Sequence, residues 1–329
     1  MKHNLQITLI LLGMFLLTQF IGLVVINEYT PKQKQVLING TLTNVTIEVL
    51  PEGFQPPQGI KPMEFIPLIV TSFIFAVVIM LILMKFGLNR ILRFWFFAVV
   101  IIAIGLTLNV ILKRAPFLGN YLIPDFMSYS FFISLVIAIP LALYKIYRRN
   151  MLVHNISELM IYPGLAAVLV PLFNIPAIIV ILILISLYDA WAVWHSKIMV
   201  KMAKFQMNEL KIFAGFFVPY IGKKQRDEIQ QIKSKYKTAK LQEKAMIKKK
   251  IKVNIAILGG GDVVFPIIAA GVVMRAFGLI PALFVVFGAL LGLTLLFMYS
   301  EKKKFYPAMP FITGGIFLGM LLFWLLQFI

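Results

Sequence analysis

Nine long apolar segments dominate the chain, and each is close to the roughly 20 residues that a helix needs to cross a bilayer. Hydrophobic residues make up 60% of the 329 positions, which is more apolar surface than a water-soluble domain can bury. We therefore predict an all-α polytopic membrane protein, a multi-pass protein of the cell membrane whose solvent is mostly lipid. The segments span residues 5–27, 64–84, 91–112, 126–146, 156–173, 175–198, 254–275, 279–299 and 307–328.

A net charge of +19 can indicate a nucleic-acid partner, but here the basic residues lie mainly in loops that flank the apolar segments. Such placement is typical of topology anchors and of contacts with anionic lipid headgroups, so no nucleic-acid partner is expected. With the N-terminus inside, the short inner loops hold nine Lys and Arg and the outer connections hold six. The positive-inside rule therefore predicts an inside N-terminus and an outside C-terminus.

Hydrophilic sequence divides the apolar series into parts. Residues 1–198 form a six-span N-terminal part, and residues 254–329 form a three-span C-terminal part. Between them, residues 199–253 form a basic cytoplasmic loop with fifteen Lys and Arg against four Asp and Glu. Within this loop, residues 205–221 have an amphipathic pattern that favours a helix lying on the inner membrane surface.

Two aspartates lie well inside apolar segments, whereas Glu64, Asp125 and Glu158 lie at segment ends where water can solvate them. A carboxylate within lipid costs at least a few kcal/mol, so Asp189 and Asp262 indicate a functional site. Each lies eight residues from the inner boundary of its segment, which is about 12 Å along a helix. Two antiparallel helices would therefore present both carboxylates at one level.

A close pair of carboxylates in a medium of low dielectric cannot ionise twice at neutral pH. One carboxyl then keeps its proton while the other is charged, and the pair titrates as a unit. It supplies a base that activates water and an acid that polarises a peptide carbonyl. The chain has no cysteine and only three histidines, none paired at helical spacing, so we expect no metal and no cofactor.

Three glycines, Gly259, Gly260 and Gly261, directly precede Asp262. Glycine lets another backbone approach closely, as a hydrolase acting on main chain requires, although a tight helix crossing would also use it. Pro266 follows four residues after Asp262 and cannot donate to its carbonyl, which loosens the helix there.

Three short patterns resemble the signatures of presenilins and signal peptide peptidases, most nearly those of the archaeal members. They are Tyr188-Asp189, the Gly-x-Gly-Asp at 259–262, and Pro307-Ala308-Met309-Pro310 at the start of the last segment. Their order, the nine-segment plan and the long loop between the aspartates are similar as well. The third signature usually reads Pro-Ala-Leu, and Met309 replaces that leucine with little change in volume.

The resemblance implies an intramembrane aspartyl protease that hydrolyses peptide bonds of single transmembrane helices, with Asp189 and Asp262 as the catalytic pair. The substrates would be membrane proteins or signal-peptide remnants, the lipid bilayer would surround the enzyme, and self-association into a homo-oligomer is left open. The residues implied to bind or position the substrate are Tyr188, Gly259, Gly260, Gly261, Pro307, Ala308 and Met309.

Other classes of protein also place aspartates in membranes. A cation- or proton-coupled transporter or channel is the alternative. Such proteins often have matching broken helices in two repeats, but the N-terminal half of this sequence has no second Gly-rich segment with an aspartate. Prepilin peptidases share Gly-x-Gly-Asp, yet they have fewer spans and no terminal Pro-Ala motif. A non-catalytic scaffold would leave two buried carboxylates unexplained. His195 is interpreted as an interfacial residue rather than a proton shuttle.

Overall fold

The computed structural model describes residues 5–38, 41–47, 85–114, 126–148, 150–196, 214–220, 254–300 and 306–327, with scattered residues between 67 and 83. Eight helices in these ranges are long and apolar enough to cross a bilayer. Helices suit this setting because lipid offers no partner for backbone N–H and C=O groups. They are α1 Leu5–Glu28, α3 Asn89–Lys113, α5 Phe126–Tyr147, α6 Met151–Leu169, α7 Ile175–Trp191, α11 Gly260–Phe277, α12 Leu279–Tyr299 and α13 Met309–Leu326.

The predicted helical membrane fold is confirmed, since eight of the nine apolar segments correspond to these helices. The remaining segment, 64–84, lies largely outside the described residues, as does most of the 199–253 loop. The ninth span, the orientation in the membrane and the three-part division of the chain therefore stay predictions.

Helices α6 and α7 are separate because the chain between them carries its own stop and start signals. A short 3-10 turn, Val170–Leu172, closes α6, and Phe173 is extended. The side chain of Asn174 then accepts a hydrogen bond of 3.0 Å from the N–H of Ala177 and caps α7. This cap satisfies one of the amides that every helix start leaves unpaired.

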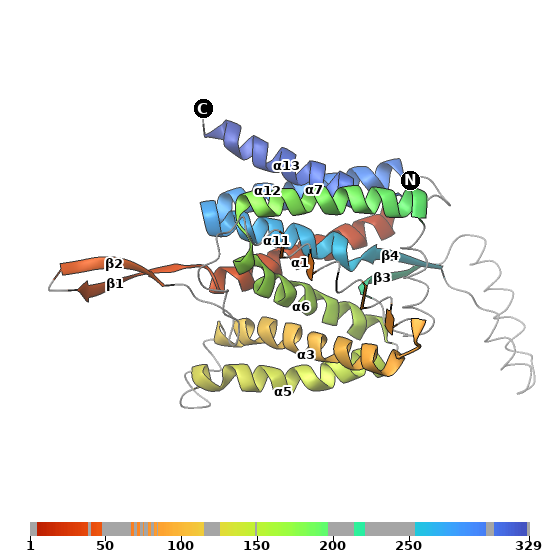
Figure 1. Cartoon of the computed structure of the whole chain (residues 1–329), viewed down its shortest axis with the longest axis horizontal. Coiled ribbons are helices and arrows are strands. Elements are labelled where there is room, and N and C mark those ends of the chain that lie inside the picture. Colours follow the sequence, from red (N-terminus) through yellow and green to blue (C-terminus); the bar gives the residue numbers. More distant parts are fainter. Residues whose placement is uncertain are drawn as a thin grey trace, which may run out of the picture.

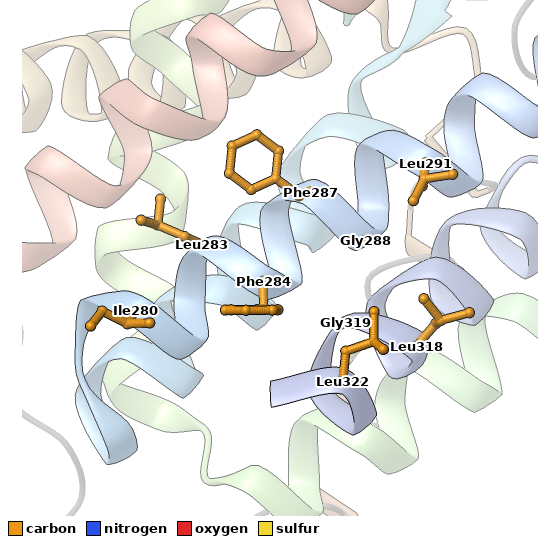
Figure 2. A pocket seen from close by; sticks show the side chains of 9 residues that line it. All are labelled: Ile280, Leu283, Phe284, Phe287, Gly288, Leu291, Leu318, Gly319 and Leu322. Atoms are coloured by element: carbon orange, nitrogen blue, oxygen red, sulfur yellow. The ribbon is translucent and has the colours of Figure 1, made fainter. Parts of the chain in front are cut away.

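Figure 1 shows the helices lying side by side in a bundle, with α1, α6 and α11 in the middle and the α3–α5 and α12–α13 pairs on either side. The α12–α13 pair packs closely through Gly288, Gly292 and Gly315, where any side chain would strike the facing backbone. A shallow apolar hollow lies between the same two helices, beside Phe284 and Gly319 (Figure 2). Its lining holds none of the residues predicted to carry chemistry.

Two antiparallel ribbons lie at opposite ends of the bundle (Figure 1). Strand β1 Lys32–Ile38 pairs with β2 Thr41–Ile47, and β3 Gly215–Tyr220 pairs with β4 Asn254–Gly259. Helix α1 begins at the end where β3 and β4 lie, and α13 ends at the other.

The second ribbon corrects two predictions. Residues 254–259 do not begin a helix, and residues 215–220 do not form an amphipathic helix; the remainder of the 205–221 stretch lies outside the described residues. Both segments are too short to show strand periodicity, and they gain their hydrogen bonds only by meeting across the long loop. Helix α11 starts at Gly260, so Gly259 is its cap and the other two glycines lie in its first turn.

Candidate active site

Asp189 lies in the last turn of α7 and is only 4% exposed. Its Oδ2 accepts a hydrogen bond of 3.0 Å from the N–H of Met309, and the N–H of Ala308 donates to the same carboxylate. One turn earlier, the hydroxyl of Ser186 donates to that of Thr313 at 2.8 Å. The carboxylate of Asp189 therefore lies at the N-terminus of α13, where free amides and the helix dipole favour a negative charge.

Asp262 lies in the first turn of α11, directly after β4. The backbone N–H of Gly259 donates to its carboxylate, so the side chain reaches back to the cap residue of its own helix. Gln19, fully buried on α1, donates a hydrogen bond of 3.0 Å to the carbonyl of Val263. Together these bonds fix the start of α11 and the direction of the carboxylate.

The two carboxylates meet. Helix α7 packs against α11, and Asp189 lies close enough to Asp262 for their charges to interact. The depth calculated above for Asp262 assumed a helix from Asn254 and is wrong, because an extended residue advances about 3.3 Å and a helical one 1.5 Å. Asp262 therefore lies further from Asn254 than the helix calculation gave.

The three glycines before Asp262 differ in what surrounds them. A Cβ on Gly260 would lie 2.9 Å from the hydroxyl of Tyr162, and one on Gly259 would lie 3.0 Å from Oδ2 of Asp262. Gly261 is exposed, and a Cβ there would meet nothing closer than 3.9 Å. The first two glycines thus make room for the protein's own side chains, and only Gly261 leaves space for another molecule.

The remaining motif residues divide between the site and the surface. Pro307 and Met309 are buried and Ala308 is partly exposed, so the last motif lies against Asp189 through its backbone. Tyr188, in contrast, points away from the carboxylates: it is 37% exposed, and the centroid of its ring lies 6.4 Å from that of Trp191. The structure therefore brings the Pro-Ala-Met segment to the carboxylates but turns Tyr188 toward the surface of α7.

His195 is exposed in a π-helical turn, Ala192–Ser196, that follows α7. In the part of the chain that the structure describes, no group of three or more His, Cys, Asp or Glu side chains could hold a metal ion.

A buried polar cluster on α6 was missed by the sequence reasoning. Glu158 is fully buried, and Lys145 of α5 donates to its Oε1 at 2.7 Å, so the prediction of a solvated Glu158 is wrong. His154 Nε2 lies 3.4 Å from the same oxygen. Tyr162, on the same face of α6, reaches Gly260. The four-residue spacing of these three α6 residues was the available signal.

Comparison with known proteins identifies the family and the fold. The family model described as signal-peptide peptidase, presenilin aspartyl protease matches residues 41–329. Two solved structures of a presenilin family intramembrane aspartate protease share the fold at 16% identity. The one in space group C222 has a TM-score of 0.55 and covers 95% of this chain and 94% of its own. The one in P2 has a TM-score of 0.58 and covers 96% of each. No curated protein matches the sequence.

Fold and family together define a multi-pass membrane hydrolase of the aspartyl protease class, which acts on transmembrane substrates within the bilayer. The chain belongs to the signal-peptide peptidase and presenilin family. A transporter and a prepilin-type peptidase are accordingly set aside.

Proposed function

We propose that Asp189 and Asp262 form the catalytic pair and hydrolyse peptide bonds of single transmembrane helices with one activated water. The observation that carries this proposal is the meeting of three distant segments at two carboxylates. Asp189 is bonded to the backbone of Met309 and interacts with the charge of Asp262. Two carboxylates that lie this close, with Asp189 buried, are expected to share a proton.

The shared proton defines the reaction. The charged carboxylate takes a proton from water as the water oxygen bonds to the carbonyl carbon, and the protonated carboxyl gives its proton to the carbonyl oxygen. The resulting gem-diol collapses as the C–N bond breaks. The leaving nitrogen takes one proton from the pair, and a diol hydroxyl returns one, so the pair regains its starting state.

An extended substrate can reach the pair by adding to β4. The N–H of Gly260 donates to the carbonyl of Ala214, so the even-numbered residues of β4 face β3. Successive residues alternate in direction, which turns the N–H and C=O of Ile257 the other way. No described residue pairs with these groups. A substrate strand is expected to bind there, immediately before Asp262.

The direction of the substrate follows from the predicted orientation. With an inside N-terminus, β4 runs from the inner surface into the membrane. A substrate span with its N-terminus outside would run antiparallel to β4, with the residues after the scissile bond paired along it. From the depth of Asp189, eight residues from the inner boundary of its segment, we expect cleavage on the inner side of the midplane, in the orientation that resembles presenilins. If the purified enzyme preferred a substrate span with its N-terminus inside, the expected substrate direction would be wrong.

The catalytic pair is tested by incubating the reconstituted protein with a model single-span substrate and weighing the products. We expect Asp189→Asn and Asp262→Asn each to abolish cleavage, because an amide cannot exchange protons. Glu28→Gln is the matched control, since Glu28 pairs with Arg114 at the surface, at 3.5 Å. Near-normal cleavage by either aspartate variant would refute the assignment, as would proton or cation transport without any product.

A further inference from the structure

Asn155 of α6 makes two hydrogen bonds to one residue of β3. Its Nδ2 donates to the carbonyl of Phe217 at 2.8 Å, and its Oδ1 accepts from the N–H of Phe217 at 3.0 Å. A side-chain amide has the same donor and acceptor as a peptide group. The pair of bonds is the one that a residue of a neighbouring antiparallel strand would make.

These bonds lie on the edge of β3 that faces away from β4. Since Ala214 bonds toward α11, the pleat directs Gly215 and Phe217 to the opposite side. Among the described residues, β3 thus has β4 on one edge and Asn155 on the other, whereas the outward edge of β4 at Ile257 has no partner. Within the described part of the chain, the edge left open to a further strand is that of β4.

His154 reinforces the same edge. Its Nε2 lies 2.8 Å from the carbonyl of Gly215, and because a carbonyl only accepts, this nitrogen carries the hydrogen. The imidazole also packs on the ring of Phe217, with 4.7 Å between centroids. Glu158, held by Lys145, lies one turn further along α6 and fixes the position of the helix that carries both residues.

We propose that Asn155 is a positioning residue that stands in for an edge strand: it holds β3 in register, so that β4 presents each substrate at one fixed distance from Asp262. This inference rests on the proposed function. It assigns to α6 the choice of which peptide bond is cut, although α6 carries neither aspartate. Loss of the clamp would let the ribbon shift, and the cut would fall at neighbouring bonds.

The test compares Asn155→Leu, which keeps the size of the side chain but has no amide, with Asn155→Gln, which restores an amide on a longer stem. Product masses on the model substrate give the cleavage positions, and hydrogen exchange reports on the Phe217 amide. For Asn155→Leu we expect faster exchange, cuts spread over adjacent bonds, and a rate lower by about tenfold, as when a partly buried donor and acceptor lose their partner. Asn155→Gln should return the cuts toward the original bond.

Ser157→Ala is the matched control, because Ser157 is a buried polar residue of α6 whose hydroxyl bonds within its own helix, to the carbonyl of Val153. It should keep the product pattern and the rate. A general loss of stability lowers the rate without moving the cut, so an unshifted cleavage position in Asn155→Leu would overturn the positioning role. Unchanged exchange at Phe217 would overturn the clamp. Absence of cleavage by the unaltered protein would refute the proposed function, and the exchange measurement would still decide on the clamp.

Discussion

At the residue scale, the side chain of each aspartate lies at a helix N-terminus and accepts hydrogen bonds from backbone amides. Asp189 bonds to the first amides of α13, and Asp262 bonds to Gly259 at the start of α11. Backbone donors have little freedom, so they hold a carboxylate in one orientation better than a flexible side chain would. The fold therefore sets the direction in which each carboxylate presents its remaining lone pairs, because the side chain is not free to rotate.

The glycine before Gly261 offers a sharp test at this scale. A Cβ on Gly260 meets the Tyr162 hydroxyl at 2.9 Å, whereas Gly261 has open space. Gly260→Ala is expected to lower the free energy of unfolding by about 1–3 kcal/mol through overpacking, and Gly261→Ala should change it little. In a Tyr162→Phe background, which removes the obstructing oxygen, Gly260→Ala should cost less. Denaturation in detergent measures all three, and equal losses in both backgrounds would show that the hydroxyl is not the obstacle.

At the element scale, the start of α13 depends on α7. Among the described residues, the N-cap position of α13 is Ala308, whose side chain offers no acceptor, and Asp189 supplies one from the neighbouring helix. The Ser186–Thr313 bond joins the same two helices one turn away. The last helix is therefore held in place by the residue proposed to act in catalysis.

We expect Asp189→Ala to be less stable than Asp189→Asn by about 1 kcal/mol, the usual cost of losing a helix cap. The amide oxygen of asparagine can still accept from the N–H of Met309, whereas alanine cannot. Both variants should be inactive, so a difference in stability between them reports on the helix cap and not on catalysis. Thermal unfolding of the purified variants measures the difference, and indistinguishable midpoints would argue against a capping role.

At the scale of the whole molecule, the hydropathy of the chain was enough to predict eight helices and the two acidic residues within them. The pairing of β3 with β4 was hidden, because its two segments lie on either side of the long loop. Glu158 was misjudged for a similar reason: its partner Lys145 lies on another helix, and hydropathy does not say which helices are neighbours. Features of a single segment, such as a membrane helix, could be predicted from the sequence. Contacts between two distant segments could not.

The pH dependence of proteolysis belongs to this scale, because it reports on groups that α7 and α11 bring together. A bell-shaped profile is expected, since the active form holds one proton between two carboxylates and is lost when a second proton is added or the last one leaves. A rate profile over a wide pH range measures it, with Glu28→Gln as the control. Inhibitors with a hydroxyl in place of the hydrated carbonyl should compete for the pair. A flat profile without such inhibition would contradict carboxylate catalysis.

The buried ion pair between Lys145 and Glu158 has a consequence for how the protein is made. Each side chain is almost fully enclosed, at 5% and 1% exposure, and either charge alone would be costly in lipid. Helices α5 and α6 should therefore leave the translocation machinery together, as a hairpin whose charges already neutralise each other. Replacing Lys145 alone by Met should lower the yield of inserted protein, and replacing Glu158 by Met as well should restore it. Equal yields from the single and double variants would show that the two helices enter the bilayer one at a time.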